Sequence, residues 1–124
     1  MAGYAELKNL LLSNVLEIRF LRRTPKEGAG PFRRMICTNS MSLLNSYNGK
    51  VILGYFAPTQ MPKFNPAQKN IVITWDILMQ NYRCVSTDNC AIEKQYPAND
   101  EFWKYFNENI YTMSTQDKIN YMTS

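Results

Sequence analysis

The feature that most constrains this chain is a hydrophobic pattern that repeats every second residue, in short runs, over its first three-quarters. Between residues 15 and 21, apolar Leu16, Ile18 and Phe20 fall on one face of a strand, and Glu17 and Arg19 fall on the other. This alternation predicts a half-buried strand. The same reasoning predicts further strands over residues 32–38, 51–56, 70–78, 82–85 and 91–94.

Turn-forming residues separate these runs. The loop 24–31 contains two glycines and two prolines, which favours a hairpin between the strands over 15–21 and 32–38. Asn48-Gly49 is the strongest short hairpin signal in the chain and predicts a turn before the strand over 51–56. Residues 57–70 carry three prolines and no apolar period, so a long loop is expected there.

Helical periodicity appears at both ends of the chain. A short helix is predicted over 3–13, and Asn99 is suited to cap a helix whose apolar stripe includes Phe102, Phe106 and Ile110. Ser114 followed by Asp117 predicts a capped last helix. The expected fold class is α+β: one domain, residues 1–124, in which a small antiparallel SH3-like or Sm-like β-barrel over about 15–95 carries an N-terminal helix and C-terminal helices over about 99–122.

Composition argues against an enzyme. The chain of 124 residues has no histidine, which removes the commonest general base and the commonest metal ligand. Its three cysteines have no metal-binding or redox spacing and are expected to be buried thiols. We therefore predict no catalytic residue, no metal and no cofactor. The chain also has no apolar run that approaches the ~20 residues of a membrane span and no signal pattern, so a cytosolic protein without a membrane partner is expected.

The net positive charge comes from the first third of the chain. Residues 1–40 hold seven basic and three acidic residues, whereas residues 41–124 hold seven of each. Arg22-Arg23 and Arg33-Arg34 flank the predicted hairpin loop, and guanidinium groups brought together there are suited to bind phosphate. Because neighbouring strand residues face opposite ways, each pair is expected to offer one arginine to a common site. The alternative is a solvated basic edge that deters strand pairing.

Four further residues complete the candidate site. Phe56 would stack on a base or pack in the core, and Asp76 would pair with an arginine or accept hydrogen bonds from a ribose. Arg83 lies outside the basic third and would either pair with a carboxylate or reach the ligand, with Tyr82 beside it. The predicted ligand-binding residues are therefore Arg22, Arg23, Arg33, Arg34, Phe56, Asp76, Tyr82 and Arg83.

Several segments, in their order and spacing, resemble a known group of proteins. They are residues 17–23, 33–39, 73–76, 81–83 and 100–103. Together they resemble phage-encoded small SH3-like β-barrel proteins, and within that group the Thoeris anti-defence protein one family. The resemblance spans roughly residues 15–110.

The resemblance implies a non-catalytic sponge in the cytoplasm of an infected bacterial host. Such proteins bind glycocyclic ADP-ribose, the signal made by bacterial TIR-domain enzymes, and some relatives also hold cyclic trinucleotides at a second site. The family forms homodimers that assemble into hexamers. For ligand contacts the resemblance suggests Arg22, Phe56 and Arg83.

Two other functions stay open at the level of sequence. A small nucleic-acid-binding barrel acting as a phage regulator would suit the basic hairpin, although the modest net charge of +4 and the neutral C-terminal part weigh against it. A phosphodiesterase is disfavoured because histidine is missing.

Overall fold

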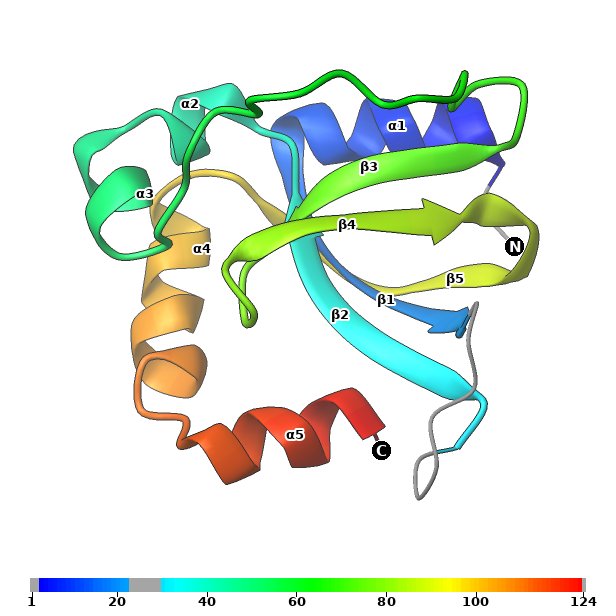
Figure 1. The fold of residues 1–124 in the computed structure, drawn as a ribbon. Coiled ribbons are helices and arrows are strands. Elements are labelled where there is room, and N and C mark those ends of the chain that lie inside the picture. The colour runs from blue at the N-terminus through cyan, green and yellow to red at the C-terminus, as the bar shows by residue number, and fades with distance from the viewer. Residues whose placement is uncertain (1–2, 23–29, 124) are drawn as a thin grey trace.

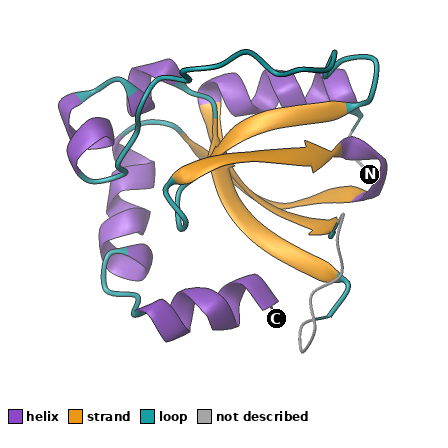
Figure 2. Cartoon of the chain, in the orientation of Figure 1, coloured by secondary structure: helices purple, strands orange, loops and turns teal. Residues whose placement is uncertain are grey.

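Five antiparallel strands form the centre of the molecule, and helices lie around them (Figures 1 and 2). The computed structural model describes residues 3–22 and 30–123. The strands are β1 (Asn14–Leu21), β2 (Phe32–Thr38), β3 (Ile71–Asp76), β4 (Asn81–Ser86) and β5 (Cys90–Pro97), in the order β4-β3-β2-β1-β5. The predicted small α+β architecture with an antiparallel sheet is therefore confirmed.

The sheet is not closed into the predicted barrel. β4 and β5 lie at opposite edges although only the short helix η1 (Thr87–Asn89) separates them in the chain, and no ladder in the described ranges joins the two. The β2–β3 ladder contains only the pairs Cys37–Asp76 and Thr38–Trp75, so the sheet is joined narrowly at its middle. A barrel needs every strand, including the edge strands, to be paired on both sides, and here the edges stay open.

One face of the sheet packs on α1 (Tyr4–Ser13), the predicted N-terminal helix. Leu7 and Leu11, one turn apart on the helix, are fully buried. They belong to a core cluster that includes Ile18 of β1, Met35 of β2 and Val72 of β3. This cluster holds the alternate residues of each strand that face α1.

The other face carries the remaining helices. These are α2 (Met41–Leu44), α3 (Tyr47–Val51), α4 (Asp100–Tyr105), the π-helix η2 (Phe106–Ile110) and α5 (Thr115–Thr123). Trp75 is fully buried in this second cluster together with Ile36, Leu44 and Phe102. β3 is thus covered on both faces, which explains why it is buried along almost its whole length, whereas the edge strands β4 and β5 are largely exposed or half-buried.

The predicted caps of the C-terminal helices are confirmed. The Asn99 side chain accepts a hydrogen bond of 2.9 Å from the backbone N–H of Glu101. Ser114 and Asp117 form reciprocal bonds of 3.0 and 3.1 Å between side chain and backbone, as in a capping box. No helix of the described part of the chain is long and apolar enough to cross a bilayer.

The hairpin predicted around Asn48-Gly49 and the strand predicted over 51–56 are both wrong. Ser46 instead caps α3, and its side chain accepts a hydrogen bond of 3.0 Å from the N–H of Gly49. A β-carbon at Gly49 would collide with the backbone carbonyl groups of Leu43 and Leu44, so glycine serves close packing of two short helices there. Residues 52–56 lead out of α3 without pairing to any strand, although Tyr55 is buried beside Trp75. The long loop predicted over 57–70 is confirmed.

Replacing Trp75 by alanine tests this description of the core. The ring is fully buried and touches the rings of Tyr55, Phe56 and Tyr82 edge-on, so Trp75→Ala should lower the free energy of unfolding by about 3–5 kcal/mol. Urea denaturation measures the loss. Tyr47→Ala, at a ring that is 80% exposed, should stay within about 0.5 kcal/mol of the wild type; equal losses would contradict the assignment.

Candidate functional site

The two arginines at the start of β2 point to opposite faces of the sheet. Arg33 shares its face with Asp76, and their side chains form an ion pair of 2.6 Å. Arg34 faces the other way and binds Glu93 of β5, with 2.8 Å between Nε and Oε1. The two side chains therefore face opposite ways, as the alternation along a strand predicts.

The ion pair between Arg33 and Asp76 is largely buried. The side chain of Asp76 is 1% exposed and that of Arg33 is 15% exposed. Burial lowers the pKa of the Arg33 guanidinium, against the raising effect of Asp76, and burial likewise raises the pKa of the Asp76 carboxyl. Burial disfavours the charged form of each group, while the short contact between them and further hydrogen bonds favour it.

Asp76 has a second structural task at the end of β3. Its Oδ1 accepts hydrogen bonds of 3.1 Å from the backbone N–H groups of Leu78 and Met79. These bonds stabilise the turn between β3 and β4. Both oxygens of the carboxylate are thus engaged within the protein, so of the two sequence interpretations the structure supports the arginine partner.

Arg22 and Arg83 lie close enough to this pair to act on it electrostatically. Both lower the pKa of Arg33, and Arg83 also lowers the pKa of Asp76. A hydrogen bond from Nη1 of Arg83 to the carbonyl of Tyr82 (3.1 Å) and one from Nε of Arg22 to the carbonyl of Gly30 (3.2 Å) orient the two guanidinium groups. We call Arg22, Arg33 and Arg83 the arginine cluster.

In the arginine cluster, Arg22 and Arg83 both act on the charge of Arg33, and Arg33 and Arg83 act on the carboxylate of Asp76. The ladder explains the arrangement, because Arg83 is paired with Thr74 and so faces the same side as Asp76. Phe20, directly opposite Arg33 on β1, places its ring 5.9 Å from the Arg33 guanidinium carbon. A compact dianion would relieve the repulsion among these guanidinium groups, and their planar donors match phosphate oxygens.

The predicted aromatic residues do not lie on that face. Tyr82 is paired with Trp75 and therefore faces the opposite side of the sheet from Arg83. Phe56 is half exposed, but its ring packs edge-on against Trp75 at 5.1 Å and Tyr82 at 5.8 Å. The Tyr82 hydroxyl donates to the carbonyl of Phe56 at 3.0 Å and to Tyr55 at 3.1 Å. The structure assigns Phe56 and Tyr82 to this aromatic cluster, apart from the arginine cluster. Arg23 lies outside the described residues.

Glu17 lies on the face of β1 that its alternating pattern predicted to be polar, yet its side chain is buried. Glu17 is only 5% exposed, because the C-terminal helices cover that face. Its two oxygens accept hydrogen bonds from the hydroxyls of Tyr96 (2.7 Å) and Tyr121 (2.6 Å), and Nζ of Lys94 lies 4.0 Å away. Burial, and then the bonds to Glu17, raise the pKa of both tyrosines and so keep them protonated as donors.

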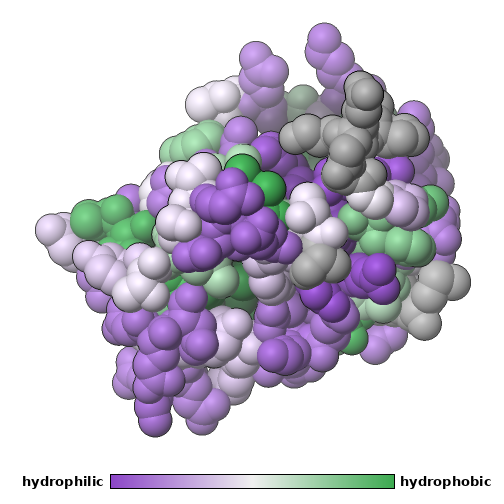
Figure 3. Space-filling view, turned by 90° about the horizontal axis from the view of Figure 1, so that it is seen from below, coloured by the Kyte–Doolittle hydropathy of each residue, from purple (hydrophilic) through white to green (hydrophobic). Residues whose placement is uncertain are grey.

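The Glu17–Tyr121 bond also places α5 next to the arginine cluster. α5 has no buried residue of its own, and much of the surface seen from that side is hydrophilic (Figure 3). Nη2 of Arg33 lies 3.5 Å from the sulfur of Met122, near the end of α5. No signal in the sequence indicated this contact, since it joins residues 89 positions apart.

Comparison with known proteins adds no identification. No family model, no curated protein and no solved structure matches the chain. Within the described residues, no group of three or more Cys, Asp and Glu side chains is placed to hold a metal ion.

Replacing Asp76 tests its role in holding the arginine cluster. Asp76→Ala leaves Arg33 buried without its counter-charge and should lower the free energy of unfolding by about 3–5 kcal/mol. Asp76→Asn keeps an oxygen that can accept from Leu78 and Met79, so its loss should be clearly smaller. Urea denaturation of both variants distinguishes the cases. Losses below 1 kcal/mol for alanine would show that the pair is not structural.

Removing one hydroxyl tests how α5 is attached. Tyr121→Phe deletes the bond to Glu17, a hydrogen bond to a charged group worth ~1.5–3 kcal/mol, and α5 has no buried residue to compensate. Amide exchange over residues 115–123 should speed up by at least about tenfold, while exchange in β1 stays slow. Tyr111→Phe, at a mostly exposed ring, is the control. Unchanged exchange in α5 would contradict this attachment.

Proposed function

We propose that this protein binds and retains a compact phosphorylated ligand at the arginine cluster, without cleaving it. The ligand class that the sequence resemblance implies is a cyclic ADP-ribose-type signal, whose diphosphate carries two negative charges in a small volume. Retention of such a signal inside an infected bacterium would make the protein a phage anti-defence sponge.

The observation that supports this proposal is the unequal charge around Asp76. Asp76 compensates one of three neighbouring guanidinium groups, and it is itself buried and fully hydrogen-bonded. Arg22 and Arg83 thus lie beside a fixed positive group, with backbone carbonyls orienting them. Donors that are held in place before the ligand arrives reduce the entropy lost on binding.

The same groups support binding rather than turnover. A guanidinium stays protonated at physiological pH, so it donates hydrogen bonds but cannot take up a proton from water or a ribose hydroxyl. Asp76, the carboxylate nearest to Arg33, has both oxygens occupied. The side chains of the cluster are therefore suited to neutralise a diphosphate and not to act as a general base.

Self-association is a further part of the proposal. The resemblance implies dimers that assemble into hexamers, and the end of the β1–β2 ladder exposes a facing pair of apolar residues, Leu21 and Phe32, at 39% and 40%. Such a pair suits an interface between copies. Analytical ultracentrifugation at micromolar protein concentration measures the mass of the assembly and so gives the number of copies in it.

Isothermal titration with glycocyclic ADP-ribose, and with ADP for comparison, tests the ligand assignment. Arg22→Met and Arg83→Met should each bind about ten- to a hundredfold more weakly, as the loss of a charge-assisted hydrogen bond implies. Their melting temperatures should stay close to that of the wild type, because neither side chain pairs with Asp76.

Arg19→Met is the matched control, since Arg19 is an exposed arginine of β1, the strand that ends just before Arg22. Its affinity should be unchanged. Heat-denatured complex should release the ligand intact, as judged by mass spectrometry. Recovery of a cleaved product, or equal weakening in Arg19→Met, would contradict the proposal.

A further inference from the structure

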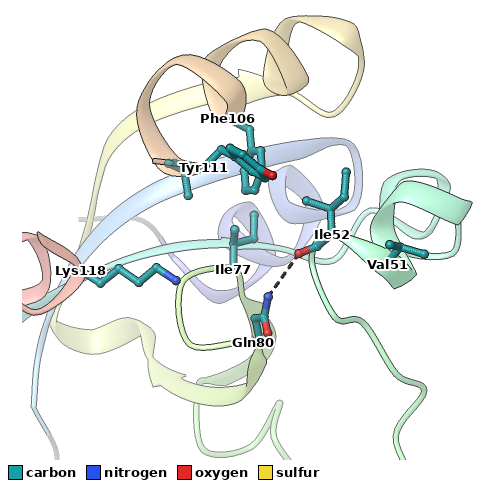
Figure 4. Close-up of a pocket in the computed structure, with 8 residues that line it drawn as sticks. Val51, Ile52, Ile77, Gln80, Phe106, Tyr111 and Lys118 are labelled. Atoms are coloured by element: carbon teal, nitrogen blue, oxygen red, sulfur yellow. Dashed lines mark hydrogen bonds between the residues drawn. The ribbon is translucent and has the colours of Figure 1, made fainter. Parts of the chain in front are cut away.

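A cavity beside the C-terminal helices shares no residue with the arginine cluster. It has a volume of about 390 Å³ and is bounded by the end of α3, the β3–β4 turn, η2 and α5 (Figure 4). That volume falls within the range of about 300–1,000 Å³ typical of small-molecule sites.

Aliphatic and aromatic side chains form part of the cavity wall, and polar groups form the rest. Ile77 and Ile110 are each 3% exposed, and Phe106 is also buried, so the floor is continuous with the hydrophobic core. At the rim, Val51 and Tyr111 are mostly exposed. Figure 4 shows the Tyr111 and Phe106 rings on one side of the space and Ile77 on the other. A flat apolar group would have aromatic surface above it and aliphatic surface below.

The backbone around the cavity is held in uncommon conformations. Gln80 has a φ of +53°, which is unusual for a residue with a side chain, and its Nε2 donates to the carbonyl of Ile52 at 3.2 Å. Gly54, with a φ of +68°, leaves room for the Gln80 side chain, which would lie 3.1 Å from a β-carbon placed there. The cavity is further lined by the π-helix Phe106–Ile110, a rare element that is frequently found at functional sites.

One charged side chain lines this cavity. Lys118 of α5 lines the cavity, and Figure 4 shows its amine directed toward Ile77 and Gln80. Within the described part of the chain, its ammonium group forms no ion pair and no hydrogen bond. A single cation at the side of a partly apolar cavity favours a ligand with one anionic group.

From these observations we infer that the cavity is a second ligand site for a small aromatic monoanion. The flat body of the ligand lies between Tyr111 and Ile77, and its carboxylate or sulfonate accepts from Lys118. The site is independent of the proposed function at the arginine cluster.

The test uses 1-anilinonaphthalene-8-sulfonate as an aromatic monoanion and N-phenyl-1-naphthylamine as its uncharged counterpart. Fluorescence titration should give saturable binding of the anion to the wild type. Lys118→Met should weaken binding of the anionic probe by about fivefold or more, as the loss of one partly buried charge contact implies. The affinity for the neutral probe should not change. Tyr111→Ala should weaken both probes.

Two controls distinguish binding at this site from binding at the arginine cluster and from nonspecific binding of the probes. Lys104→Met removes an exposed lysine of α4 outside the cavity and should bind both probes as the wild type does. In methyl NMR spectra, the anion should shift Ile52, Ile77 and Ile110. Shifts confined to other isoleucines, or equal anion affinity in wild type and Lys118→Met, would overturn the inference.

Discussion

The fold and the candidate site both depend on the ion pair between Arg33 and Asp76. β2 and β3 share only two paired residues on each strand, so the sheet is joined narrowly at its centre. The carboxylate of Asp76 adds a side-chain contact from β3 to β2 and, through its other oxygen, holds the turn that leads to β4. The buried carboxylate of Asp76 can stay charged there because both of its oxygens accept hydrogen bonds.

That pair also decides which arginines can act together. Arg33 forms an ion pair with Asp76 on one face of the sheet. Its neighbour Arg34 forms an ion pair with Glu93 on the opposite face. Arg83 joins Arg33 because the antiparallel register places it opposite Thr74, two residues before Asp76. The grouping of Arg33 with Arg83 therefore arises from strand geometry rather than from the density of arginines in the sequence.

The side of the sheet away from α1 is organised differently. There Trp75 gathers the rings of Tyr55, Phe56 and Tyr82 around it, and Glu17 is bound by two tyrosines. α5 is attached at Glu17, reaches Arg33 through Met122 and contributes Lys118 to the cavity beside the C-terminal helices. The last helix is thus a structural link between two candidate sites that share no residue.

The sequence by itself determined the local elements whose signals are local. The structure contains the strands that alternation predicted over 15–21 and 70–78, the helix caps at Asn99 and Ser114, and the apolar helix face of Leu7 and Leu11. Each of these features depends on neighbours within a few residues. Tertiary structure decided the rest. Gly49 is needed for close helix packing and not for a hairpin, and Glu17 is buried by a helix about a hundred residues later in the chain. β4 and β5 do not pair with each other, so the sheet stays open. These outcomes depend on which segments meet in space, and a pattern along the chain does not contain that information.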